Sequence, residues 1–182
     1  MKIINFFRKK YNKDRKYQYS PVDEFEPYLH QLPDSNIKTY ITERVMGQIK
    51  WYDSKSNENQ HRYKQMMVAS VILSAIIPVL TIIVDYGSAV IKIFITALSS
   101  SVTAISAILT LYNYKDLWVQ YRSNCEILKS VLHRFFNKCG EFSDLSDEQM
   151  YQNLINSCED YMTKEFRTWV AHSSQVSESK DS

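Results

Sequence analysis

The chain has 182 residues, with 22 Lys and Arg against 20 Asp and Glu, so its formal net charge is only +2 at pH 7. This length fits one compact unit and excludes a large multidomain enzyme. Cysteines occur only at positions 125, 139 and 158, an odd number without a CxxC pair. That usage excludes a secreted disulfide scaffold, argues against a zinc site and suits a reducing compartment.

Residues 1–33 form a predicted N-terminal arm. Residues 1–19 carry seven basic side chains against one acid, interleaved with five aromatic side chains. Two interpretations stay open: contact with anionic lipid and a solvated tail. Nucleic-acid binding is not favoured, because one short arm supplies no folded basic face.

Helix caps follow the arm at Asp34-Ser35-Asn36, and no proline occurs over 37–65. The sequence therefore predicts a helix over 37–65 that runs directly into the next segment.

Two runs without a charged residue decide the fold class. Met66–Val84 has 19 residues, eleven of them Val, Ile or Leu, and Ile93–Leu111 has another 19. About 20 apolar helical residues cross the hydrocarbon core of a bilayer. We therefore predict membrane spans over 66–84 and 93–111, joined as an antiparallel hairpin by an outer loop over 85–92. A buried hairpin in a soluble bundle is the alternative, but helices of such bundles usually keep a polar face.

Charges near the predicted spans indicate their orientation. The loop carries only Lys92, whereas the stretches within about 20 residues of the outer ends of the hairpin carry seven basic residues, namely Lys50, Lys55, Arg62, Lys64, Lys115, Arg122 and Lys129. Basic residues concentrate on the cytoplasmic side of membrane proteins. We therefore expect the protein to lie in the inner membrane, with both termini in the cytoplasm.

The second span is predicted to continue as a cytosolic helix over 112–139. Its packing face is a heptad series of mostly apolar residues: Tyr114, Trp118, Tyr121, Cys125, Leu128, Leu132 and Phe135. A capping box at Ser146-Asp-Glu-Gln149 begins a last helix over 147–170, and residues 172–182 form a predicted disordered tail. Ion pairs of Asp53 with Lys55 and of Arg122 with Glu126 are expected to hold the cytosolic helices.

The expected fold is thus an all-α membrane protein. A two-helix transmembrane hairpin extends into a cytosolic helical bundle, and a C-terminal helix packs on that bundle.

The order of these signals resembles the SLATT family, bacterial two-span effectors associated with nucleotide second-messenger synthases and sensors. The resemblance covers 37–169 within a predicted domain of 34–171. It rests on a set of separated motif residues: Tyr40, Arg44, Gln48, Trp51, Tyr52, Asp53, Lys55, Asn59, Arg62, Pro78, Trp118, Tyr121, Arg122, Glu126, Glu159, Glu165 and Trp169. It implies a membrane pore or membrane-perturbing effector in defence against phage, with a cytosolic nucleotide-signalling partner.

The second span carries a stripe of hydroxyl side chains at spacings of three and four. Its members are Thr96, Ser99, Thr103, Ser106 and Thr110, and Asn113 extends the stripe. A large apolar stripe about 110° around the helix, which suits contact with lipid, consists of Ile95, Leu98, Val102, Ile105 and Leu109. The hydroxyl stripe fits either the lining of a water-filled pore or close packing between helices.

Asp85, at the outer mouth, fits either a cation-attracting ring or a solvated loop acid. No catalytic constellation, metal site or cofactor motif is predicted. The four histidines are scattered, and glycines at 47, 87 and 140 form no phosphate-binding loop.

Because two spans cannot enclose a pore, the functional hypothesis is a homo-oligomeric pore that opens on a stress or infection signal. The alternative is a non-conducting membrane anchor that recruits a cytosolic partner, and a soluble helical hydrolase is a remote third.

Overall fold

The computed structural model describes residues 20–83 and 89–178, with side chains described for 20–82 and 89–164. Within these ranges every regular element is a helix. The chain divides into two compact units, which we describe separately. The split unit combines Met1–Trp51 with Cys125–Ser182, and the hairpin unit is Tyr52–Asn124. The basic residues of 1–19 and the acid Asp85 lie outside the described residues.

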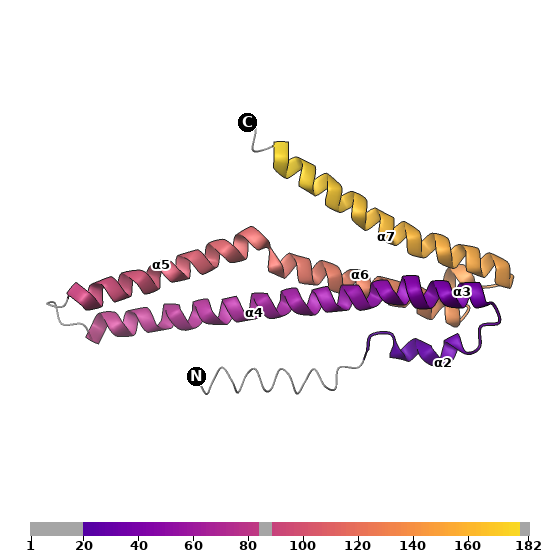
Figure 1. The fold of residues 1–182 in the computed structure, drawn as a ribbon, viewed down its shortest axis with the longest axis horizontal. Coiled ribbons are helices and arrows are strands. Elements are labelled where there is room, and N and C mark those ends of the chain that lie inside the picture. Colours follow the sequence, from indigo (N-terminus) through magenta and orange to yellow (C-terminus); the bar gives the residue numbers. More distant parts are fainter. Residues whose placement is uncertain (1–19, 84–88, 179–182) are drawn as a thin grey trace. The chain divides into compact units, whose positions relative to one another are not determined.

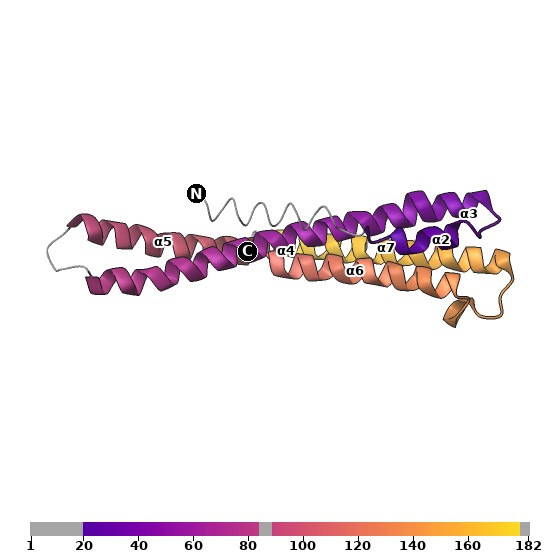
Figure 2. The ribbon, with the colours of Figure 1, turned by 90° about the horizontal axis from the view of Figure 1, so that it is seen from below.

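Helices α4 (Met46–Ile83) and α5 (Ala89–Tyr112) supply the hairpin, and the first half of α6 (Tyr114–Phe136) follows. Figures 1 and 2 show α4 and α5 side by side in opposite directions. As predicted, α4 passes from the polar segment before residue 66 into the apolar run without a break, and it continues through Pro78. Helix α5 begins at Ala89, four residues before the predicted span.

A single heptad series begins at Val45, immediately before α4, and runs along that helix. Its members, all buried or half-buried, are Val45, Ile49, Tyr52, Ser56, Asn59, Tyr63, Met66, Ser70, Leu73, Ile77 and Leu80. The half-buried residues of the 93–111 segment of α5 are Ile95, Leu98, Val102, Ile105 and Leu109, again at heptad spacing. Two such stripes on adjacent antiparallel helices are the pattern typical of a coiled-coil seam, and we call them the seam.

The expectation that this apolar stripe of α5 faces lipid is therefore wrong. Its five residues are the half-buried ones of this segment, and α4 is the helix that lies beside it. Large apolar residues at heptad spacing on two adjacent helices pack well against one another.

The predicted continuous helix from the second span into 112–139 is also wrong, because the helix breaks at Asn113. This residue has a φ of 47°, in the left-handed region that asparagine tolerates better than most non-glycine residues. Its carbonyl accepts hydrogen bonds from the amides of Asp116 and Leu117, at 3.0 and 3.1 Å, and so begins α6.

The split unit has its core where Phe25, Phe135 and Phe142 are fully buried. It contains the short helices η1 (Asp23–Phe25), α2 (Glu26–Leu29), α3 (Ser35–Thr39) and η3 (Gly140–Phe142), and the long α7 (Asp147–Glu178). Val22, Phe25 and Leu29 are buried, so packing begins inside the predicted arm of 1–33. The spacing of three and four between these apolar residues is the signal for that short helical segment.

Both predicted caps are present. The Asp34 carboxylate accepts from the Asn36 amide at 2.7 Å, and Ser146 and Gln149 exchange capping-box hydrogen bonds.

Helix α6 ends at Phe136 rather than near 139, because Lys138 adopts a left-handed φ of 49° and the Cys139 amide donates to the Arg134 carbonyl. Helix α7 continues to Glu178, into the predicted tail of 172–182, since 147–178 contains no glycine or proline to end it.

A π-helical turn, η2 (Tyr40–Val45), joins α3 to α4, and the Met46 amide donates to the Ile41 carbonyl. It corrects a mismatch of register. The buried residues here are Ile37, Ile41 and Val45, at two successive spacings of four. A straight α-helix that carried the heptad series of α4 backward from Val45 would instead bury Thr42 and Lys38. The extra residue in the π turn keeps the isoleucines inward.

Candidate functional site

The hydroxyl stripe of α5 lies beside the face that is turned to α4, and not on that face. Its members Thr96, Ser99, Thr103, Ser106 and Thr110 are all exposed, as is Asn113. Each stripe residue directly follows a seam residue in the sequence, so the stripe lies about 100° around the helix from the seam. The structure therefore separates the stripe from the contact that holds the hairpin together, and close packing inside one hairpin does not use it.

Each hydroxyl of the stripe donates a hydrogen bond to the carbonyl four residues earlier in α5. The donor–acceptor distances are 2.9 Å for Thr96 and Ser99, 3.2 Å for Thr103, and 3.0 Å for Ser106 and Thr110. With the proton directed back to the helix, the remaining lone pairs of each oxygen point outward. The stripe can therefore accept hydrogen bonds from water or contact a cation.

At the polar end of the hairpin unit, α4 and α6 approach closely at Ser56. This side chain is 3% exposed, and its Oγ donates to the Trp118 carbonyl at 3.0 Å. The rings of Tyr52 and Tyr121 lie 6.3 Å apart. A small residue in the seam allows this close approach of the two helices.

The ion pairs at this end differ from the prediction for Asp53. The Asp53 carboxylate lies 3.0 Å from Nη1 of Arg122, not on Lys55, and it also accepts from Asn57. Residues two apart on a helix point in different directions, so Asp53 and Lys55 do not meet. Lys55 instead contacts Glu58, which also binds Arg62. These two contacts lower the pKa of Glu58, through the hydrogen bond from Lys55 first.

In the split unit, three residues named by the family resemblance meet. Nε and Nη2 of Arg44 each lie 3.0 Å from an oxygen of Glu159, and the Tyr40 hydroxyl donates to the same carboxylate at 3.1 Å. The hydrogen bond from Arg44 lowers the pKa of Glu159. Burial, together with the neighbouring Cys158 and Glu159, raises the pKa of Tyr40. This carboxylate clasp joins the π turn to α7, a contact that sequence spacing does not reveal.

The remaining motif residues are placed as follows. Gln48 is half-buried and Trp51 is exposed on α4, and Asn59 donates to the Lys55 carbonyl at 2.8 Å. Glu126 is exposed on α6. Glu165 and Trp169 lie on α7 beyond the described side chains.

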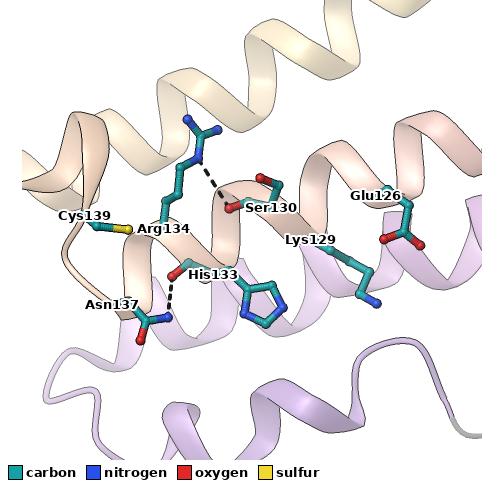
Figure 3. A pocket seen from close by; sticks show the side chains of 7 residues that line it. All are labelled: Glu126, Lys129, Ser130, His133, Arg134, Asn137 and Cys139. Atoms are coloured by element: carbon teal, nitrogen blue, oxygen red, sulfur yellow. Dashed lines mark hydrogen bonds between the residues drawn. The ribbon is translucent and has the colours of Figure 1, made fainter.

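A shallow pocket of about 370 Å³ opens on α6 in the split unit (Figure 3). It is lined by Glu126, Lys129, Ser130, His133, Arg134, Asn137 and Cys139. Its cations already have structural partners: Lys129 lies 2.7 Å from Glu24, and Arg134 lies 2.6 Å from Glu141. These charges hold the segment of η1 and the turn of η3, so the pocket does not assemble a reactive group. Among the side chains that the structure describes, no three His, Cys, Asp or Glu are grouped to hold a metal ion.

Length and composition show two helical segments that are long and apolar enough to cross a membrane, in Ser35–Ile82 and Ala89–Phe142. Their most apolar windows are not buried within the molecule. In a soluble fold such windows would be covered, so their exposure is consistent with membrane spans.

Comparison with known proteins matches residues 47–150 to a family model described as "Protein of unknown function (DUF4231)". The match covers α4, α5 and α6 and ends at the start of α7. No curated protein and no solved structure matches the chain. Since the matched segment makes up more than half of the sequence, the chain belongs to the DUF4231 family.

Proposed function

We propose that this protein is a homo-oligomeric membrane pore. In this proposal α4 and α5 of each copy span the inner membrane over 66–84 and 93–111, and both termini lie in the cytoplasm. The excess of Lys and Arg outside the hairpin supports that orientation. Several copies are needed because one pair of helices cannot enclose a channel.

One observation carries the proposal: the exposed hydroxyl stripe lies apart from the seam. The apolar stripe of α5 already serves the contact with α4, so the hydroxyls are not needed inside the hairpin. Polar side chains within spans generally face a bundle interior or a water-filled cavity rather than lipid. Copies arranged with this stripe inward would line a pore with oxygen acceptors.

The resemblance to SLATT effectors supports the biological part of the proposal. The pore would open on a stress or phage-infection signal and dissipate ion gradients. A cytosolic nucleotide-signalling partner would supply that signal, and the split unit offers it a folded cytoplasmic surface.

The test is current recording after reconstitution in planar bilayers across a salt gradient. Thr103→Leu and Ser106→Leu should reduce unit conductance by severalfold, because a bulky apolar side chain replaces an acceptor. Ser101→Leu is the matched control: it makes the same kind of change at an exposed position of α5 outside the stripe. Equal effects of Ser101→Leu and Ser106→Leu would remove the stripe from the pore. No current from a stable oligomer in any condition would favour the non-conducting anchor.

A further inference from the structure

The break at Asn113 changes the phase of the heptad series between α5 and α6. Along α5 the seam reaches Leu109, and the next seam residue is Tyr114, which is 8% exposed. This step of five residues exceeds the heptad step of three or four. It corresponds to about one and a half extra residues, or about 150° of rotation at 100° per residue.

The contacts of the hairpin unit show why the phase change is needed. Trp118 and Arg122 on α6 bind Ser56 and Asp53 on α4, and the large apolar stripe of α5 also faces α4. A continuous helix could not present both faces to α4 at once. The left-handed φ of Asn113 makes the two compatible, and Figure 1 shows the chain changing direction between α5 and α6.

A different face of α5 would meet α4 if Asn113 became helical while α6 stayed in place. Carried back from Tyr114 at heptad spacing, the α6 seam continues through Leu111, Ala107, Ala104, Ser100, Ala97 and Ile93. All six are exposed in the structure, and the four central residues are small. Small residues at this spacing are typical of close helix contacts in membranes.

Two physical considerations bear on the free-energy difference between the two arrangements. In lipid there is no hydrophobic penalty for turning Leu98, Val102 and Ile105 outward, because lipid tails are as apolar as leucine. The present arrangement instead carries the strain of a left-handed non-glycine residue. Neither arrangement therefore has the large advantage that burial gives in a soluble protein.

We propose that Asn113 is a rotational hinge with two states. In the state seen here the large apolar stripe of α5 faces α4. In the straight state α5 rotates by about 150°, the face of Ala97, Ser100 and Ala104 meets α4, and the hydroxyl stripe moves to the other side of the helix pair. The hinge rests on the proposed function in one respect: the rotation would carry the stripe into or out of the pore.

Disulfide trapping in membranes tests the two states without recording any current. The Asp53–Arg122 and Ser56–Trp118 contacts set the antiparallel register, which carried along the hairpin places Leu73 about level with Val102. Leu73→Cys with Val102→Cys reports the present state, and Leu73→Cys with Ser100→Cys reports the straight state. Cys139→Ser removes the exposed native thiol, while Cys125 and Cys158 are buried.

Asn113→Gly and Asn113→Ala form the matched pair of hinge variants. Glycine adopts a left-handed φ freely, whereas alanine favours a continuous helix. We expect the ratio of straight-state to present-state cross-linking to be about fivefold higher in Asn113→Ala than in Asn113→Gly, a ratio that corresponds to about 1 kcal/mol. Equal ratios in the two variants would overturn the hinge.

Two readouts keep the result clear. Circular dichroism and size-exclusion in detergent verify that Asn113→Ala is folded, and Asn113→Asp gives an independent variant that tolerates left-handed φ and should behave like wild type. A shift of cross-linking in a protein that never conducts would contradict the pore but keep the hinge. Conductance in a protein whose cross-linking is the same in both hinge variants would support the pore and contradict the hinge.

Discussion

Arg44 and Glu159 form a two-point ion pair, in which Nε and Nη2 of the guanidinium each lie 3.0 Å from one carboxylate oxygen. The pair joins the π-helical turn to α7, 115 residues further along the chain, and the Tyr40 hydroxyl adds a third hydrogen bond. Both charged side chains are partly exposed, at 53% and 38%, so water weakens the attraction between them. The clasp is therefore expected to position α7 more than to dominate the stability of the fold.

Glu159→Gln should lower the free energy of unfolding by about 1 kcal/mol, the upper range for an exposed ion pair. For a domain of this size that corresponds to a decrease in Tm of about 2–4 °C. Thermal unfolding in detergent, followed by circular dichroism, measures it. Asp160→Asn removes a charge from the exposed neighbour on the same helix and is the control. Equal decreases in both variants would show that net charge, not the clasp, is responsible.

The same pair predicts a dependence on acid pH. Arg44 holds the pKa of the Glu159 carboxyl below its ordinary value of 4.5. The contribution of the clasp to the free energy of unfolding is therefore fully present above pH 4.5. It is lost as pH falls through the lower pKa of the folded state, because protonation removes the charge. The Tm of wild type should therefore fall more steeply than that of Glu159→Gln between about pH 5 and pH 3. If the Tm of wild type and the Tm of Glu159→Gln fall in parallel with pH, the lowered pKa of Glu159 in the clasp is wrong.

Thiol labelling should distinguish the three cysteines. Cys139 is exposed, whereas Cys125 and Cys158 are buried, and burial raises the pKa of the Cys158 thiol to about 12. Because the thiolate is the reactive form, we expect maleimide to label Cys139 in the folded protein and the other two only after unfolding. With an impermeant maleimide, Cys139 should react in inverted membrane vesicles but not in intact cells stripped of the outer membrane. Labelling from outside would reverse the proposed orientation.

Removal of one residue from the π turn should be tolerated. Deleting the exposed Thr42 would convert the spacing of four and four between Ile37, Ile41 and Val45 into four and three, which a straight α-helix accommodates. We expect the helical content and Tm to stay close to those of wild type. Deleting the exposed Lys50 is the matched control, because it shifts the seam of α4 with no π turn to absorb the change. If both deletions unfold the protein, the explanation of the π turn is wrong.

The close approach of α4 and α6 at Ser56 limits the size of the side chain that this position can hold. Ser56→Leu should destabilise the hairpin unit by about 1–3 kcal/mol, since a larger side chain must force α4 and α6 apart. Ser56→Ala removes only the hydrogen bond to the Trp118 carbonyl, which retains its place in α6, and should cost about 1 kcal/mol or less. Chemical unfolding of the two variants in detergent gives the comparison. A larger loss in Ser56→Ala would show that the hydrogen bond, not the space, matters here.

Local patterns in the sequence locate the long helices and two of their caps. The lengths of the apolar runs predicted the two helices that could cross a membrane, and short motifs predicted the caps at Asp34 and Ser146. The heptad residues from Tyr114 to Phe135 predict a packing face, and they are buried or half-buried. Each of these features depends on residues within a few turns of one another, so periodicity and composition suffice.

Only the tertiary structure decided which faces meet. The inward position of the α5 apolar stripe, the Asp53–Arg122 pair and the three-residue clasp on Glu159 join segments far apart in the chain. The π turn and the break at Asn113 arise for the same reason. Each adjusts the rotational phase of one helix against another, and that phase is set by packing between helices rather than by the local sequence of either one.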